Sequence, residues 1–282
     1  MSLKTAARPP TRTAIPAAPA STAEATKPAR PAARRPARLP EVNFSDYGDV
    51  RTLHLGTEWV QGSMLLNAPY EIELDYVQRM MAWLLFVPPS SVARRHAMQL
   101  GLGAAALTKF SRKKLRMRTT AVEINPQVVS ACRFWFKLPP DDERLQVVLG
   151  DAALKIQNTD WAGTVDALQV DLYDEDAAAP VLDSEDFYAD CRRLLTEEGC
   201  MTVNLFGEDS SYPQSVAKIS AAFGADAVWA FRPTREGNTV VLAQRTPSRP
   251  DRDELVARAE VIQTRWGLPA AKWLKVFKPL EA

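Results

Sequence analysis

Two glycines and one acidic residue are spaced as in sites that bind nucleosides. Gly101 and Gly103 stand one residue apart directly after a short apolar run, and Glu123 ends the next apolar run, 20 residues beyond Gly103. A glycine pair lets a backbone turn pass close under a ligand before a helix starts. An acidic residue about 20 residues later can accept hydrogen bonds from ribose hydroxyls. This spacing favours a nucleoside-binding site.

Three further aspartates follow the next two apolar runs. Asp151 lies in a Gly-Asp-Ala sequence that ends at Ala152, and Asp171 and Asp174 form an Asp-x-x-Asp pair. Open α/β sheets bind ligands at the carboxyl ends of their strands, so acids that follow successive strands should lie close together. Each one alone could be a helix cap or a solvated loop charge. With the glycine turn, they indicate a ligand-binding site at this edge of the sheet.

Histidine and cysteine are too few and too scattered for several other kinds of site. His54 and His96 are the only histidines, so a histidine-based triad or metal site is not expected, and both are interpreted as structural or surface residues. Cys132, Cys191 and Cys200 form no Cys-x-x-Cys pair. This odd set suits a reducing compartment, here the cytoplasm, and argues against a disulfide framework or a zinc site. No metal is predicted.

Apolar runs alternate with helical stretches along residues 91–250. Regular alternation of this kind predicts an α/β fold, in which a seven-stranded, mostly parallel, doubly wound sheet is covered by helices on both faces. These residues would form the nucleoside-binding catalytic domain. The last two strands are separated only by a short turn with Gly237, so we expect an antiparallel hairpin at the sheet edge. Strands are predicted near 96–101, 119–124, 145–149, 166–171, 200–205, 227–231 and 239–244, and helices at 104–115, 126–136, 184–196 and 213–223.

Smaller regions flank this domain. Residues 41–90 are predicted to form a small region made of a β-hairpin at 50–66 and a helix at 71–86. Residues 251–282 are predicted to form a helical extension that begins at the capping residue Asp251.

The first 40 residues differ in composition from the rest of the chain. They hold eight Lys or Arg, one acid and eight of the 21 prolines. Because prolines obstruct helices and almost no apolar residue is available for a core, residues 1–40 are predicted to be a disordered Pro/Ala/Arg-rich tail. A transit peptide is the alternative, which the prolines disfavour because they would break its amphipathic helix.

The charge of the remaining residues and the length of the apolar runs exclude two classes of partner. Residues 41–282 carry 27 bases (35 less 8) and 33 acids (34 less 1), which is a mildly acidic balance. We therefore expect no nucleic acid partner. The longest fully apolar run, 80–87, is far shorter than the ~20 residues of a membrane-spanning helix, so no membrane association is expected.

The order of these motifs over roughly 48–245 resembles that of the spermidine synthases (polyamine aminopropyltransferases), whose fold is that of the class I S-adenosylmethionine-dependent methyltransferases. The resemblance implies that Glu123, in Val-Glu-Ile-Asn, binds ribose and that Asp151 meets the adenine amino group. Asp171 and Asp174 match the family's catalytic-loop aspartates. The other cofactor-binding positions that the resemblance implies are Gln61, which is similar to a glutamine that reaches the nucleoside, Gly101, Gly103 and Ala152.

The chain departs from this family where an amine would be held. The family's Gly-Gly-Gly-Asp-Gly-Gly is replaced by Gly-Leu-Gly-Ala-Ala-Ala, so that Ala104 stands in the place of the aspartate that holds an ammonium. The polyamine-side signature, Asp-Glu followed by Tyr-His-Glu, is replaced by Tyr-Glu-Ile-Glu-Leu-Asp-Tyr at 70–76. Either the ligand preference has changed, or Glu73 or Asp75 supplies the missing charge. An acid introduced at position 104 would lie in the first helical turn and is expected to cost little stability.

The resemblance implies a transferase that uses decarboxylated S-adenosylmethionine to move an aminopropyl group to a small-molecule amine. Asp171 would accept the proton of that amine, with Asp174 in support. A homodimer is also implied. A methyltransferase that uses ordinary S-adenosylmethionine is the alternative, because Ala104 removes the main discriminator against that cofactor. A non-catalytic protein that kept a nucleoside pocket is the third interpretation.

Overall fold

The computed structural model describes residues 39–173, 182–206 and 211–280. Most of the predicted tail lies outside these residues, and so does Asp174. The sequence assigns Leu39 and Pro40 to the tail, but both belong to the folded unit that begins at Leu39. The carbonyl of Pro40 accepts a hydrogen bond of 3.0 Å from the side chain of Asn125, which fixes the chain at this point.

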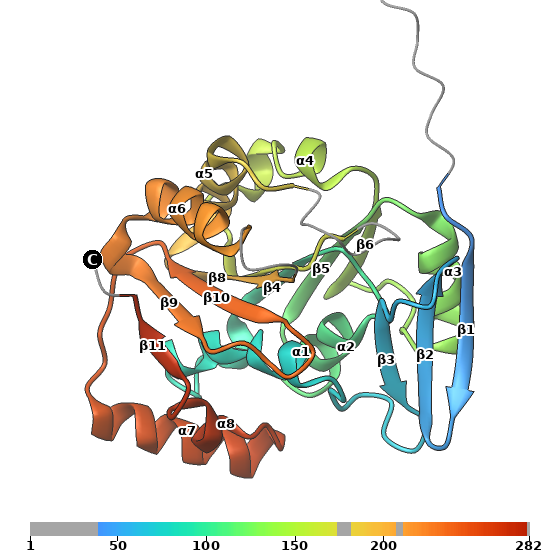
Figure 1. The fold of residues 1–282 in the computed structure, drawn as a ribbon, viewed down its shortest axis with the longest axis horizontal. Coiled ribbons are helices and arrows are strands. Elements are labelled where there is room, and N and C mark those ends of the chain that lie inside the picture. The colour runs from blue at the N-terminus through green and yellow to red at the C-terminus, as the bar shows by residue number, and fades with distance from the viewer. Residues whose placement is uncertain (1–38, 174–181, 207–210, 281–282) are drawn as a thin grey trace, which may run out of the picture. The chain divides into compact units, whose positions relative to one another are not determined.

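An eight-stranded sheet forms the centre of the folded unit, in the order β11-β9-β10-β8-β7-β4-β5-β6 (Figure 1). The strands from β6 to β8 pair in parallel, while β10, β9 and β11 extend the sheet in antiparallel pairs. The mostly parallel sheet is therefore confirmed. The bounds are β4 His96–Leu100, β5 Arg118–Glu123, β6 Leu145–Leu149, β7 Val165–Val170, β8 Leu195–Leu205, β9 Val228–Phe231, β10 Thr239–Gln244 and β11 Phe277–Pro279.

The predicted hairpin between the last two strands is present, because β9 and β10 pair in antiparallel fashion. Its predicted position at the sheet edge is wrong, since β11 pairs with β9 and adds an eighth strand outside it. A strand of three residues is too short to show an alternating pattern, and Pro279 argues against a strand, so no local pattern predicts β11.

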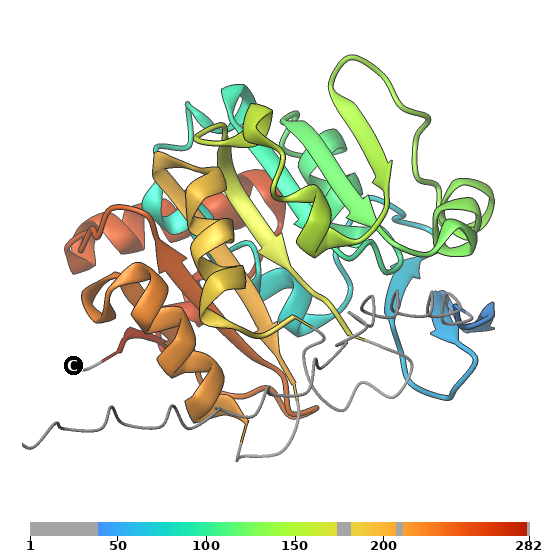
Figure 2. The ribbon, with the colours of Figure 1, turned by 90° about the horizontal axis from the view of Figure 1, so that it is seen from above.

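Helices cover both faces of the sheet (Figures 1 and 2). One face carries α4, α5 and α6, whose apolar side chains pack in one cluster with residues such as Leu100 and Leu168. The other face carries α2, α7 and α8, which pack around Ala97 and Trp229. The bounds are α2 Ala106–Lys113, α3 Pro126–Trp135, α4 Ala152–Lys155, α5 Glu185–Leu194, α6 Tyr212–Phe223, α7 Arg252–Trp266 and α8 Ala270–Trp273.

Side-chain caps explain where several of these helices begin. Asn125 accepts a hydrogen bond from the backbone of Gln127 at the start of α3, and Asp251 accepts one from Glu254 at the start of α7. The predicted cap at Asp251 is thus confirmed. None of the helices in the described part of the chain is long and apolar enough to cross a membrane.

A small three-stranded antiparallel sheet lies at the N-terminal end of the folded unit. It consists of β1 Val42–Tyr47, β2 Val50–Leu55 and β3 Gly62–Leu65. The predicted hairpin corresponds to β2 and β3, which pair from Val50 opposite Leu65 to Leu53 opposite Gly62. Strand β1 was not predicted. It pairs only with β2 and is largely exposed, so its residues carry little of the apolar signal by which strands are recognised.

The long helix expected over 71–86 is instead two short helices. Helix α1 covers Asp75–Arg79, and a 3₁₀ helix covers Ala82–Phe86. The side chains from Met80 to Leu85 are all almost fully buried, whereas a regular helix would expose one face. Packing on every side therefore overrides the helical preference of this run. Three further 3₁₀ turns lie at Val92–Arg94, Thr159–Trp161 and Ala225–Ala227.

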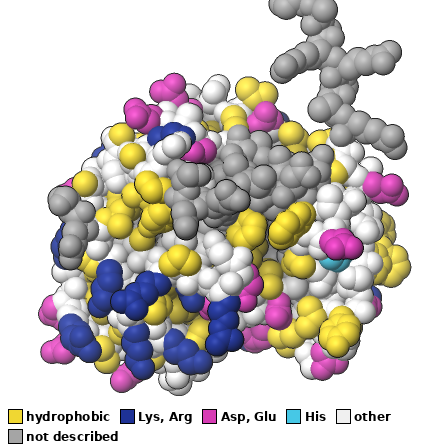
Figure 3. Space-filling view, viewed as in Figure 1, with side chains coloured by type: hydrophobic (Ala, Val, Ile, Leu, Met, Phe, Trp, Pro, Cys, Tyr) yellow, Lys and Arg dark blue, Asp and Glu magenta, His cyan; other side chains and the backbone are white. Residues whose placement is uncertain are grey.

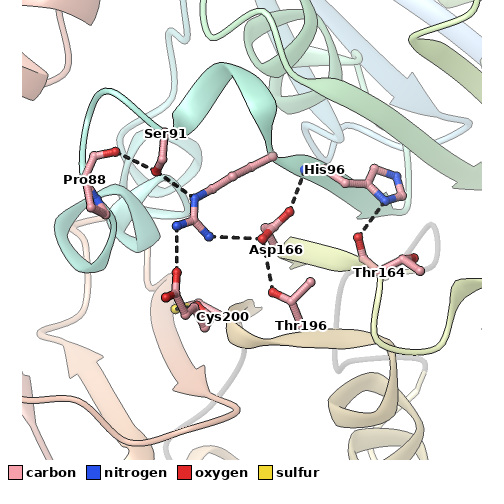
Figure 4. A network of polar contacts seen from close by, with 9 residues as sticks. Pro88, Ser91, His96, Thr164, Asp166, Thr196 and Cys200 are labelled. Carbon is pink, nitrogen blue, oxygen red and sulfur yellow. Dashed lines mark hydrogen bonds and ion pairs between the residues drawn. The ribbon is translucent and has the colours of Figure 1, made fainter.

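A polar network ties the amino ends of β4, β7 and β8 together (Figure 4). Asp166 pairs with Arg95 at 3.0 Å and accepts a 2.8 Å hydrogen bond from the backbone of His96. The ring of His96 contacts Thr120 Oγ1 at 2.9 Å, and burial lowers its pKa to about 4. His96 therefore lies at the end of the sheet away from the strand carboxyl ends, in agreement with its interpretation as a structural residue.

Candidate active site

A cavity of about 800 Å³ lies at the carboxyl ends of β4 to β7. The loop between β2 and β3 and the segment before α1 form its other wall. Seven of the eight predicted site residues line this cavity, while Asp174 lies outside the described residues. The seven are Gln61, Gly101, Gly103, Glu123, Asp151, Ala152 and Asp171.

The glycine turn after β4 brings three parts of the cavity wall together. Gly101 and Gly103 have positive φ angles of 84° and 49°, which favour glycine. A Cβ on Gly101 would lie 2.1 Å from the carbonyl oxygen of Asp171, and one on Gly103 would lie 2.7 Å from that of Gln61. These glycines are needed because neighbouring protein backbone approaches so closely.

Glu123, the last residue of β5, is held by backbone amides. Its Oε2 accepts a 2.8 Å hydrogen bond from Leu102, and its Oε1 accepts one of 2.8 Å from Asn125. Burial raises the pKa of Glu123, and these amide hydrogen bonds oppose that rise. Since a carboxylate oxygen has more than one lone pair, the fixed carboxylate can still accept hydrogen bonds from ribose hydroxyls.

Asp151 combines a structural task with a place on the cavity wall. It follows β6 and caps α4, because its Oδ1 accepts a 2.8 Å hydrogen bond from the backbone of Ala153. Its neighbours Gly150 and Ala152 also line the cavity. The helix-cap role that the sequence allowed for this residue is present, and the cap turns the side chain to a fixed position at the cavity.

Asp171, directly after β7, is the centre of a hydrogen-bond chain. Asn204 donates to its Oδ1 at 2.9 Å, and the hydroxyl of Tyr76 donates to its Oδ2 at 3.3 Å. Asn204 in turn accepts a 3.1 Å hydrogen bond from Asn238. Burial raises the pKa of Asp171, and the bonds from Asn204 and Tyr76 oppose the rise. The pKa of Tyr76 is also raised well above its usual value, by burial and by the charge of Asp171, so this phenol stays a donor.

Tyr173 is occupied by backbone contacts. Its hydroxyl donates to the carbonyl of Asn204 at 3.0 Å and accepts from the backbone of Phe206 at 2.5 Å. Burial raises its pKa, so the phenol is neutral. The ring of Phe206 also makes an edge contact with Trp59, at 6.1 Å between centroids. Together these side chains form an aromatic part of the cavity wall.

All of the Asp, Glu, Lys and Arg residues in the described cavity lining are acidic. Besides the acids named above, Glu58, Glu73, Asp75 and Glu236 line the cavity, and its described lining contains neither Lys nor Arg. Figure 3 shows Lys and Arg gathered instead over the C-terminal elements, at the lower left of that view. No group of His, Cys, Asp and Glu side chains in the described ranges could hold a metal ion. The cavity is therefore suited to a positively charged organic ligand.

Residues 101–242 match the family model of the spermine/spermidine synthase domain. The polyamine aminopropyltransferase of Neisseria meningitidis is 33% identical over 248 residues, which cover 86% of this chain and 92% of that protein. This chain belongs to the spermine/spermidine synthase family. The family resemblance inferred from the sequence motifs is thus confirmed.

Solved structures share the fold of this synthase-family chain. A probable spermidine synthase from Corynebacterium glutamicum matches with a TM-score of 0.63 at 18% identity, over 82% of this chain and 85% of that one. Human Methyltransferase-like protein 13, solved in complex with SAH, matches with a TM-score of 0.62 at 21% identity, over 69% and 93% of the two chains. At such identities the likeness shows the fold alone, which is the expected methyltransferase-like one.

Ala104, at the position of the family's aspartate, does not line the main cavity. It is 2% exposed and packs against Gly62, where a Cβ would lie 2.6 Å from the nitrogen of Ala104. Ala105 adopts the left-handed conformation, with φ of 57°, and α2 begins only at Ala106. The expectation that an acid at position 104 would lie in the first helical turn is therefore wrong, since this residue is buried before the helix.

Tyr76, Asn204 and Asn238 were not predicted as site residues of this family member. They reach Asp171 from α1, from the end of β8 and from the turn before β10. Asn204 ends a strand whose carboxyl end points to the site, which was a usable signal. Tyr76 ends the 70–76 stretch that replaces the family's polyamine-side signature, but its contact with Asp171, 95 residues away in the chain, depends on tertiary packing that the sequence does not record.

Proposed function

We propose that this chain is an aminopropyltransferase that uses decarboxylated S-adenosylmethionine and a small alkylamine. The observation that carries the proposal is the position of Asp171, a carboxylate held by Tyr76 and Asn204 in a cavity whose described wall has no Lys or Arg. Both substrates of such a transfer are cations, and membership of the synthase family agrees with this chemistry.

The nucleoside part of the donor would be held at the strand ends. Glu123 would accept hydrogen bonds from the ribose hydroxyls, and Gln61 would reach the nucleoside from the opposite wall. Asp151 and Ala152 would meet the adenine. The turn at Gly101 and Gly103 would pass under the donor, since neither residue has a side chain there. All of these residues line the same cavity, which supports the assignment.

Asp171 would act as the proton acceptor. An alkylamine with a pKa near ~10.4 is almost fully protonated at neutral pH and is then not a nucleophile. Asp171 takes a proton from the ammonium, and the free nitrogen pair attacks the propyl carbon next to the sulfonium. The carbon–nitrogen bond forms as the carbon–sulfur bond breaks. The electron pair of the broken bond stays on the sulfur, which thereby becomes the neutral thioether of methylthioadenosine. Burial raises the pKa of Asp171, which makes it a stronger base than an exposed aspartate.

The methyltransferase alternative rests on Ala104 and on the fold shared with a methyltransferase solved in complex with SAH. Ordinary S-adenosylmethionine brings a carboxylate, for which the described cavity wall offers no Lys or Arg. The acidic side chains there would repel it and attract the aminopropyl ammonium instead. The charge of the cavity therefore favours the decarboxylated donor.

Product analysis tests the proposal. The purified chain is incubated with decarboxylated S-adenosylmethionine and putrescine, and in parallel with ordinary S-adenosylmethionine and the same amine. Release of methylthioadenosine in the first reaction supports aminopropyl transfer. Release of S-adenosylhomocysteine in the second would support the methyltransferase, and nucleoside binding without either product would support a non-catalytic homologue. A homodimer stays a prediction, which light scattering would check.

A further inference from the structure

Glu73 is a partly buried carboxylate on the wall of the main cavity. The hydroxyl of Ser63 donates a 2.6 Å hydrogen bond to its Oε2. None of the ion pairs formed among the described residues includes Glu73. Its charge is thus held in place by a neutral donor and is not balanced by a cation of the protein, which is unfavourable away from water.

The other acids of the cavity wall are engaged in different ways. Asp75 pairs with Arg79 at 2.6 Å, and Asp151 caps a helix. Glu58 and Glu236 are exposed at the rim, where water solvates their charges. Glu123 is buried, but both of its oxygens accept hydrogen bonds from backbone amides. Glu73 and Asp171 therefore remain as the two at least partly buried carboxylates of the described cavity wall that side-chain hydroxyl or amide groups hold, without a cation or a backbone amide.

Glu73 and Asp171 both line the main cavity, and the hydroxyl groups that bind them border a smaller space that shares part of the same wall. This space of about 20 Å³ is lined by Ser63, Leu74, Tyr76, Ala104 and Asp171, among others, and Glu73 reaches its edge only through Ser63. The hydroxyl of Ser63 donates a hydrogen bond to Glu73, and the hydroxyl of Tyr76 donates one to Asp171. Leu74 is the residue that follows Glu73 in the chain. A space above ~15 Å³ can hold one water molecule, and an ammonium group has a similar size.

We propose that Glu73 binds the terminal ammonium of the aminopropyl donor and so determines the preference for a cationic donor. This inference rests on the proposed function. The glycine turn offers no carboxylate at Ala104, which is buried against Gly62. Glu73 offers one from the N-terminal wall, oriented by Ser63. Charge-assisted hydrogen bonds of this kind are short and strong, and they would be lost when the propylamine leaves with the acceptor.

Two ligands separate this role from a merely structural one. Methylthioadenosine carries the nucleoside but no ammonium, whereas decarboxylated S-adenosylmethionine carries both. If Glu73 only ties the wall together through Ser63, its replacement should affect both ligands alike. If Glu73 holds the ammonium, only the second ligand should bind more weakly.

The test is calorimetric titration of both ligands into the full chain, into Glu73→Gln and into a matched control, Glu71→Gln. Glutamine keeps the size of Glu73 and an acceptor for Ser63, so the variant should fold. Glu71 lies two residues away and pairs with Lys114 outside the cavity lining. We expect Glu73→Gln to bind the decarboxylated donor about 10- to 100-fold more weakly, the range for a hydrogen bond to a charged group, and to bind methylthioadenosine within twofold of the original chain. Glu71→Gln should match the original chain for both ligands.

Three results would overturn the assignment of Glu73. The first is that Glu73→Gln loses the same affinity for both ligands, and the second is that it loses affinity for neither. The third is an unchanged affinity for the donor with a raised KM for the acceptor amine, which would place Glu73 on the acceptor side. The original chain reports separately on the proposed function. If it releases methylthioadenosine in the presence of amine, the function stands whatever Glu73→Gln does. If it does not bind the decarboxylated donor at all, both proposals fail together.

Discussion

The hydroxyl of Tyr76 donates a 3.3 Å hydrogen bond to Oδ2 of Asp171 and so links the N-terminal wall of the cavity to the carboxyl end of β7. Asn204 holds the other oxygen of the same carboxylate. Asp171 is therefore fixed from two sides, with its pKa raised by burial and moderated by its donors. If Asp171 is the base, as proposed, it can meet an incoming ammonium without a change of its own geometry.

Asp171→Asn should reduce turnover by about 10²- to 10⁴-fold, because asparagine keeps the shape of the side chain but cannot accept the proton. The affinity for methylthioadenosine should change little, since the role proposed for Asp171 is toward the amine. Steady-state kinetics and calorimetry on the same preparation check both statements. An active variant would show that the base lies elsewhere.

Tyr76→Phe should move the acidic limb of the pH–rate profile to higher pH. The hydrogen bond from Tyr76 lowers the pKa of Asp171, so its removal should raise that pKa further. Asp171 must be ionised to accept a proton, and activity is lost as the pH falls through its pKa. In the variant this loss should therefore begin at a higher pH. The profile of kcat/KM for both proteins provides the measurement, and a shift to lower pH would contradict the account.

Glu123→Ala should weaken the binding of methylthioadenosine by about 1.5–3 kcal/mol if Glu123 accepts hydrogen bonds from the ribose. The structure adds a second effect. The amides of Leu102 and Asn125 would lose their acceptors, which should lower the free energy of unfolding by about 1–3 kcal/mol. Glu123→Gln keeps one acceptor and serves as the milder variant. Calorimetry and chemical denaturation separate the two effects, and unchanged affinity in a folded variant would refute the ribose assignment.

Ala104→Asp should destabilise the protein, contrary to what the sequence suggests. The new carboxylate would be buried before α2, against the backbone of Gly62, and the described lining of the small space that Ala104 borders contains neither Lys nor Arg. We expect the free energy of unfolding to fall by at least about 2 kcal/mol, as for a buried polar group without partners. Ala104→Ser provides a smaller change for comparison. A thermal unfolding midpoint of Ala104→Asp equal to that of the original chain would contradict this placement.

The parts of the site that the sequence predicted are those fixed by local spacing. Gly101 and Gly103 lie on one strand-to-helix turn, and Glu123 and Asp171 each stand at a strand end, so the βα pattern alone brings them to one edge of the sheet. The burial of Ala104 could not be predicted in this way. It depends on the approach of Gly62 from another sheet, which no local pattern records.

The fold, like the site, was predicted where local sequence patterns determine it and missed where tertiary packing does. Regular alternation predicted seven strands of the main sheet, whereas β1 and β11 were missed because one is largely exposed and the other has three residues. One helix was predicted over 71–86, but the run from Met80 to Leu85 is buried on all sides, and in such a run the apolar pattern does not report the type of helix. Tyr76 lies just before this run, and its contact with Asp171 follows from tertiary packing alone.

Transfer of a labelled aminopropyl group tests the central claim most directly. Decarboxylated S-adenosylmethionine that carries ¹³C in its aminopropyl chain is incubated with an unlabelled diamine and the full chain, and the amines are analysed by mass spectrometry. The account predicts a new amine that is heavier by one labelled aminopropyl unit, formed in a one-to-one ratio with unlabelled methylthioadenosine. The same product should be nearly absent with Asp171→Asn. An unlabelled diamine recovered unchanged, with the donor bound but intact, would contradict the claim that this protein transfers the group.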